Sequence, residues 1–158
     1  MKTLIVYDSV FGNTEKIALA ISQSIGSEDV KVLRVGDVKT EQLMGLDLLI
    51  VGSPTRAFNP TKEITVFLNN IPSNSLQGIK VLSFDTRIAT ADKKSRILNG
   101  LVKVFGYAAQ PIADKLVKKG GNLAIPPEGF FVKDSEGPLK DGELERATDW
   151  VRLAVKAL

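Results

Sequence analysis

Residues 3–14, TLIVYDSVFGNT, decide the fold of this chain. The apolar run at positions 3–7 is typical of a strand that is buried on both faces of a parallel sheet. A turn-rich segment follows, and from Asn13 or Thr14 onward isoleucines recur every four residues as far as Gly26. That spacing predicts an amphipathic helix that ends at the glycine. The chain therefore opens as a strand, a loop and a helix.

The same alternation of strands and helices continues through the rest of the sequence. Further strands are predicted over Val30–Val35, Leu46–Val51, Ile79–Phe84 and Asn122–Ile125. Pro126–Pro127 should end the last of these, and Phe130–Val132 resumes extended chain. Further helices are predicted over Pro60–Asn70, over Ala109–Lys119 and from Gly142 onward. The segment Ile88–Gly106 is compatible either with a short helix around 94–105 or with a long loop. Five strands in this alternation predict a single α/β domain over residues 1–158, with a doubly wound parallel sheet of order 2-1-3-4-5 and helices on both faces.

The last predicted helix has one apolar face, and the only tryptophan of the chain falls within this helix. The residues expected on that face are Leu144, Ala147, Val151, Ala154 and Leu158. We interpret Trp150 as a residue of the core or of helix packing.

The composition excludes several kinds of chemistry. The chain has 158 residues and no Cys or His, which rules out thiolate nucleophiles, His general bases and metal sites built on either residue. Any redox chemistry therefore needs a cofactor. The net charge of +3 is too small to indicate a nucleic-acid partner. The sequence shows neither a signal peptide nor a run of about 18 apolar residues that could span a membrane, so the cytoplasm is the expected location.

The predicted sheet order indicates where a ligand should bind. In an open doubly wound sheet, ligands bind beyond the carboxyl ends of the strands, at the point where the strand order reverses. For the order 2-1-3-4-5 this point lies between the first and third strands. The loops expected there are 8–14, 52–59 and 85–87, and all three are rich in small, hydroxyl or amide residues.

The first of these loops has the composition of an anion site. It joins a buried strand to a helix start, where backbone amides and the helix dipole favour negative charge. The hydroxyls of Ser9 and Thr14 and the amide of Asn13 can donate to phosphate oxygens. The loop contains no Lys or Arg, so these donors are neutral. The alternative is a plain capped turn, with Asn13 or Thr14 as the N-cap.

The segment Tyr7–Glu15 resembles the phosphate loop of flavodoxins, whose pattern is Ser/Thr-x-Thr-Gly-x-Thr. Ser9, Gly12 and Thr14 match this pattern, whereas Phe11 stands where the middle threonine is usual. The similarity extends along the chain to GSPTR at 52–56, FDTR at 84–87, PPEGFFV at 126–132, EGPL at 136–139 and GELE at 142–145.

This resemblance implies a flavodoxin-like fold and an FMN cofactor. The first loop would hold the FMN phosphate, the other two loops would hold the ring system, and no side chain would act as a catalytic acid or base. The expected cofactor-binding residues are Ser9, Val10, Phe11, Gly12, Asn13, Thr14, Ser53, Pro54, Thr55, Arg56, Ala57, Phe58, Asn59, Asp85, Thr86 and Arg87. No metal site is expected.

The chain departs from electron-carrier flavodoxins in two ways. Those proteins usually hold the flavin between two aromatic side chains, but Phe58 is the only aromatic candidate in the second loop and Asp85–Arg87 offers none. They also tend to be acidic, whereas this chain has a pI of about 9.1. The presumed flavin loops carry Arg56 and Arg87 against Asp85, so the last reduction step should be easier than in those carriers.

We expect an FMN-binding protein that transfers electrons to a redox partner protein or a small acceptor. One alternative is an FMN-dependent oxidoreductase that acts directly on a small acceptor such as a quinone. Another is a flavin-free interaction or signalling module on the same fold.

Overall fold

The computed structural model describes residues 1–89 and 107–158. The helix or loop expected at 94–105 lies outside the described residues. The strands are β1 (Thr3–Tyr7), β2 (Val30–Arg34), β3 (Leu48–Pro54), β4 (Lys80–Ile88), β5 (Asn122–Leu123) and β6 (Glu128–Val132). The helices are α1 (Asn13–Ile25), η1 (Val35–Asp37), η2 (Thr40–Leu43), α2 (Lys62–Asn70), α4 (Ala109–Lys118) and α5 (Glu143–Lys156).

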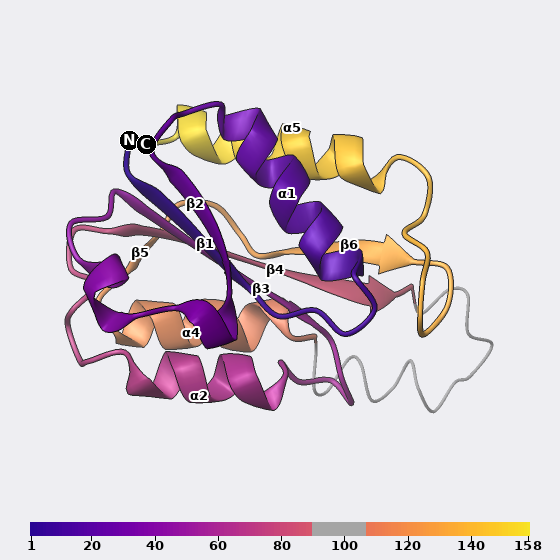
Figure 1. Ribbon diagram of the computed structural model, residues 1–158, viewed down its shortest axis with the longest axis horizontal. Coiled ribbons are helices and arrows are strands. Elements are labelled where there is room, and N and C mark those ends of the chain that lie inside the picture. Colours follow the sequence, from indigo (N-terminus) through magenta and orange to yellow (C-terminus); the bar gives the residue numbers. More distant parts are fainter. Residues whose placement is uncertain (90–106) are drawn as a thin grey trace.

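The sheet has the predicted order, β2-β1-β3-β4-β5, and all the pairings between its strands are parallel. Helices α1 and α5 cover one face of the sheet, and α2 and α4 cover the other (Figure 1). Parallel strands need crossover connections, and the alternating sequence pattern supplies a helix for them. The predicted doubly wound fold is therefore confirmed.

The fifth position of the sheet differs from the prediction of one strand. Two short strands fill it: β5 pairs with Lys80 and Val81 at the start of β4, and β6 pairs with 84–88 at its end. Between them stand Pro126 and Pro127, which have no N–H to donate to a ladder. The prolines interrupt the strand, and the chain resumes pairing after them.

Pairing with β6 also extends β4 to Ile88, beyond its predicted end at Phe84. Asp85–Arg87, expected in a loop, therefore lies within a strand. This correction matters for the site, because alternate side chains of a strand point to opposite faces of the sheet.

Each face of the sheet packs a separate hydrophobic cluster. On the side of α1 and α5, Trp150 packs edge-on against Phe84 and Phe130, with ring centroids 6.4 and 6.0 Å away. Its interpretation as a core residue is thus confirmed. The cluster under α2 and α4 is aliphatic and includes Ile64 and Leu68.

Two residues predicted on the buried face of the last helix are exposed instead. Leu144 is 41% and Leu158 45% exposed. At the start of α5 the buried position belongs to Glu143, which accepts a hydrogen bond from the Phe131 N–H at 2.7 Å. Leu158 lies beyond the end of the helix at Lys156.

Candidate functional site

The β1–α1 loop ends at a helix start without a side-chain cap. The N-cap is Gly12, in the left-handed region at φ 87°, so neither Asn13 nor Thr14 fills the capping position expected for a plain turn. The Asn13 side chain instead donates to the Glu136 carbonyl at 3.1 Å, which ties α1 to the turn after β6. Because no side chain caps α1, its first amide N–H groups remain as donors for a ligand.

The hydroxyl groups beside this helix start keep donors available. The Ser9 Oγ accepts from the Gly12 N–H at 3.0 Å, which leaves the Ser9 O–H free to donate. The Thr14 and Thr86 Oγ1 atoms lie 2.8 Å apart. One of them must donate to the other, so this pair retains one hydroxyl hydrogen for a further acceptor.

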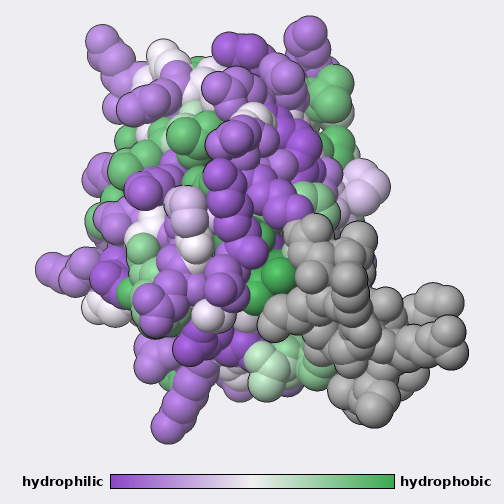
Figure 2. Space-filling model, turned by 90° about the vertical axis from the view of Figure 1, so that its right-hand side faces the viewer, coloured by the Kyte–Doolittle hydropathy of each residue, from purple (hydrophilic) through white to green (hydrophobic). Residues whose placement is uncertain are grey.

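Ten of the sixteen predicted residues line a cavity of about 110 Å³ at the carboxyl edge of the sheet. They are Ser9, Val10, Phe11, Asn13, Thr14, Pro54, Thr55, Arg56, Thr86 and Arg87. Figure 2 faces this edge, which is largely hydrophilic with smaller hydrophobic areas between the polar residues. The three predicted segments therefore meet at one place, as the sheet order required.

The other six predicted residues do not line the cavity. Gly12 caps α1, and Ser53 is fully buried, with its Oγ accepting from the Thr61 N–H at 3.0 Å and donating to the Pro54 carbonyl at 2.9 Å. The side chain of Ser53 thus shapes the loop after β3. The remaining residues are Ala57, Phe58, Asn59 and Asp85.

Residues 56–59 form a strained tight turn beside the cavity. Arg56 and Asn59 exchange two backbone hydrogen bonds, of 2.8 and 2.9 Å, across the turn. Ala57 and Phe58 both have positive φ, 46° and 69°, which non-glycine residues rarely adopt. Each such residue costs about 1–2 kcal/mol of backbone energy, so the rest of the loop must hold the turn in place.

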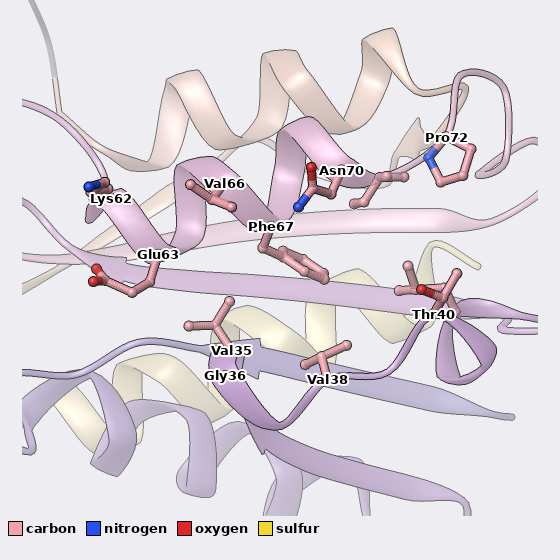
Figure 3. A pocket seen from close by; sticks show the side chains of 12 residues that line it. Val35, Gly36, Val38, Thr40, Lys62, Glu63, Val66, Phe67, Asn70 and Pro72 are labelled. Atoms are coloured by element: carbon pink, nitrogen blue, oxygen red, sulfur yellow. The ribbon is translucent and has the colours of Figure 1, made fainter.

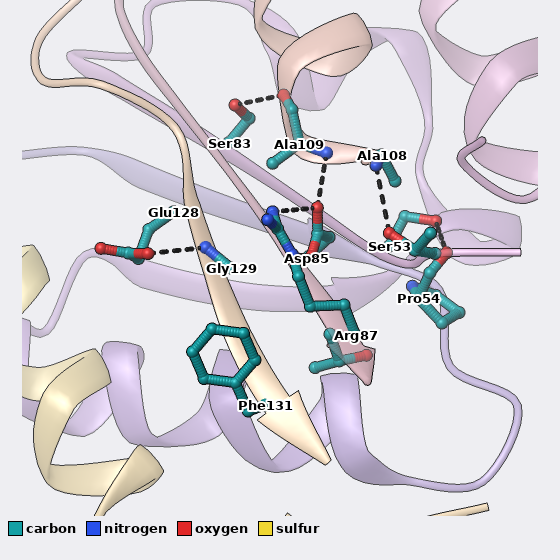
Figure 4. Close-up of polar contacts among 12 residues, drawn as sticks. Ser53, Pro54, Ser83, Asp85, Arg87, Ala108, Ala109, Glu128, Gly129 and Phe131 are labelled. Atoms are coloured by element: carbon teal, nitrogen blue, oxygen red, sulfur yellow. Dashed lines mark hydrogen bonds and ion pairs between the residues drawn. The ribbon is translucent and has the colours of Figure 1, made fainter. Parts of the chain in front are cut away.

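A buried ion pair lies behind the cavity (Figure 4). Arg87 donates to both carboxylate oxygens of Asp85 at 2.6 Å, and the Ala109 N–H at the start of α4 donates to the same carboxylate at 2.8 Å. Burial raises the pKa of the Asp85 carboxyl above its ordinary value, and Arg87 opposes this rise. Asp85 is fully buried, so its role is to hold Arg87 and α4.

The Arg87 guanidinium is also held between an aromatic ring and the backbone. Its central carbon lies 3.8 Å from the centre of the Tyr107 ring. On Gly129 in β6, an added Cβ atom would lie 2.2 Å from the guanidinium, so only glycine leaves room for it. The position of Arg87 in the cavity wall is therefore fixed by β4, β6 and α4 together.

Sequence reasoning missed several residues around the site. Arg34, at the end of β2, donates to the Ser9 carbonyl and lies 3.5 Å from the Asp8 carboxylate, which supports the β1–α1 loop. The sheet register places Arg34 beside Tyr7. The contact of Arg34 with the β1–α1 loop could therefore have been predicted only from the strand order. Tyr107 gave no local signal, and Gly129 stood in the PPEGFFV stretch without any indication of its contact with Arg87. The further cavity-lining residues are Ile88, Val132 and Ser135.

A second, larger cavity lies elsewhere on the molecule. It has a volume of about 440 Å³ and lies between α2 and the η1–η2 segment, with Phe67 and Val38 facing each other across it (Figure 3). None of the sixteen predicted residues lines it.

In the two described ranges, no helix combines the length and apolar character needed to cross a bilayer.

Comparison with known families identifies the class of protein. A family model described as Flavodoxin domain matches residues 4–126. This match spans well over half of the chain, so the chain belongs to the flavodoxin-domain family, and the resemblance seen in the sequence is confirmed. The family implies a flavin cofactor and a function in electron transfer.

Solved structures agree with this assignment. A flavodoxin from the domain Archaea is 26% identical, with a TM-score of 0.77 and coverage of 99% of both chains. Oxidised Flavodoxin 1 from Bacillus cereus is 20% identical, with a TM-score of 0.79 and coverage of 100% of this chain and 99% of that one. A flavodoxin, WrbA-like protein from Agrobacterium tumefaciens is 20% identical, with a TM-score of 0.72 and coverage of 98% and 96%. The latter two show the fold alone. No curated protein sequence matches the chain.

Proposed function

We propose that this protein binds FMN at the carboxyl edge of its sheet and transfers electrons between redox partners. The observation that carries the proposal is the start of α1, where uncapped amides and the hydroxyls of Ser9 and Thr14 face one cavity in a flavodoxin-domain chain. This donor set suits a phosphate group, because helix N-termini attract anions. When bound, FMN supplies the redox chemistry, since the chain has no Cys and therefore no thiol–disulfide couple of its own.

Different residues of the chain bind different parts of FMN. Residues 9–14 bind the phosphate through backbone amides and hydroxyls. Thr55, Thr86 and Arg87 form the wall of the site toward the ring system, and Asp85 keeps Arg87 in position. A redox partner protein or a small acceptor receives the electrons.

The direct test compares two flavins that differ only in the phosphate. The apoprotein is titrated with FMN and with riboflavin while flavin fluorescence and visible absorption are followed. We expect much tighter binding of FMN, because riboflavin forfeits several hydrogen bonds to an anion, each worth about 1.5–3 kcal/mol. Equal affinity for both flavins would contradict the phosphate site, and no binding of either would favour a flavin-free module.

A second candidate function is direct reduction of a small acceptor such as a quinone. The favouring observation is the position of Trp150, which lies in the core and cannot cover a flavin. A flavin face without an aromatic cover would be open to a planar substrate. Steady-state turnover of NAD(P)H with a quinone by the FMN-loaded protein separates this enzyme from a carrier.

A further inference from the structure

One cation at the cavity has no carboxylate partner in the part of the chain that the structure describes. Arg56 follows β3, is exposed and lines the cavity at the start of α1. Its guanidinium carbon lies 5.7 Å from the centre of the Phe11 ring, which belongs to the β1–α1 loop. The side chain therefore reaches from the second loop to the first. It forms no ion pair with any residue in 1–89 or 107–158.

Two other arginines near the cavity, Arg34 and Arg87, each pair with a carboxylate. Arg34 lies 3.5 Å from the Asp8 carboxylate, and Arg87 binds both oxygens of Asp85. Of the described residues that line the cavity, none is an Asp or Glu. Among the described residues that line the cavity, Arg56 is thus the charged side chain without an opposite partner, and it stands next to the positive end of the α1 dipole.

We propose that Arg56 supplies the phosphate site with the cation that the β1–α1 loop lacks, and so makes the protein select phosphorylated flavin over riboflavin. This inference rests on the proposed function. A phosphate monoester carries a charge of about −1.5 to −2 at pH 7, whereas riboflavin has the same ring and no charged group. Arg56 therefore attracts the phosphate group, which FMN has and riboflavin lacks.

Phe11 has a positioning role in this arrangement. The ring stands where the flavodoxin pattern has a hydroxyl donor, so the loop loses one hydrogen bond to the phosphate. The ring face instead attracts the guanidinium, which keeps Arg56 over the loop. The hydroxyl donor that the β1–α1 loop lacks at position 11 is thus replaced by the cation of Arg56 in the loop after β3.

The experiment measures the dissociation constants of FMN and riboflavin for the wild type, Arg56→Gln and Arg56→Lys at two ionic strengths. In Arg56→Gln we expect FMN to bind about tenfold more weakly and riboflavin to change less than about twofold. Arg56→Lys retains the charge and should keep most of the preference for FMN. Added salt should weaken FMN binding more in the wild type than in Arg56→Gln.

A matched control removes one arginine charge away from the site. Arg152 is exposed on α5 and pairs with Asp149, so Arg152→Gln should leave both affinities unchanged. Phe11→Leu keeps an apolar side chain but removes the ring face, and we expect it to weaken FMN binding about two- to threefold.

Two results would overturn the role of Arg56 without contradicting the proposed function. If Arg56→Gln weakens FMN and riboflavin equally, Arg56 contacts the ring system, and if it changes neither, the side chain contacts no flavin. A wild type that binds neither flavin would overturn the proposed function and this inference with it. Circular dichroism of each variant confirms that the fold is retained.

Discussion

At the residue scale, the hydroxyl of Thr14 is the sharpest test of the phosphate loop. Thr14→Val keeps the side-chain shape and removes the donor, so we expect a loss of about 1–2 kcal/mol in FMN affinity, or about five- to thirtyfold. The helix should survive, because the N-cap of α1 is Gly12 and no side-chain bond from Thr14 caps the helix. Fluorescence titration measures the affinity, and far-ultraviolet circular dichroism measures the helix.

The control for this variant is Thr86→Val. It removes the other hydroxyl of the same 2.8 Å pair, which shares one free hydrogen between its two members. Without the Thr86 hydroxyl, the Thr14 hydroxyl still has its own hydrogen to donate to the phosphate, so Thr86→Val should weaken FMN binding less than Thr14→Val. Unchanged affinity in Thr14→Val would exclude the hydroxyl from the phosphate site.

The residues of the first loop also show how far a local pattern can predict a site. The hydroxyls of Ser9 and Thr14 were predictable as donors, because they sit at a strand–loop–helix junction. The role of Asn13 was not, because its partner, the Glu136 carbonyl, lies 123 residues further along the chain. No local motif carries that information.

At the scale of elements, β6 explains what the sequence pattern left out. The apolar run of β4 ends at Phe84, and its extension to Ile88 depends on pairing with Glu128–Val132. Because of that pairing, Asp85–Arg87 is part of the sheet and not of the predicted loop. Strand order follows from the alternation of strands and helices, whereas the length of a strand depends on its neighbour.

The contact between β6 and β4 gives a prediction for stability. In Gly129→Ala, the new Cβ would lie 2.2 Å from the Arg87 guanidinium. The end of an arginine side chain is usually free to move, but here Asp85 and Tyr107 hold it. We expect the free energy of unfolding to fall by about 1–3 kcal/mol, as measured by denaturant titration.

Gly36→Ala is the matched control for this variant. An added Cβ at Gly36 has no atom within 4 Å, and the residue does not have a positive φ. Its free energy of unfolding should stay close to that of the wild type. Equal stability of the two variants would show that Arg87 moves aside at little cost.

At the scale of the whole molecule, the charges around the site are arranged differently from what composition indicates. The sequence places Arg56 and Arg87 in the flavin loops against one carboxylate, Asp85, and predicts an easier last reduction step. In the structure, the Asp85 carboxylate cancels most of the charge of Arg87. Asp85 and Arg87 share one face only because pairing with β6 makes residues 85–88 part of a strand, so the sign of the net charge was predictable and its source was not.

This arrangement predicts the direction in which each charge moves the reduction potential of bound FMN. Fully reduced flavin can carry negative charge, so a nearby cation favours the last reduction step. Arg56→Gln should lower the potential of that step by on the order of 10–30 mV, since solvent screens an exposed side chain. Asp85→Asn removes the negative charge that balances Arg87 and should raise the potential of this step. Arg152→Gln should leave the potential unchanged. Redox titration of the FMN-loaded proteins measures all three, and a low wild-type potential that none of the substitutions moves would mean that these arginines do not tune the flavin.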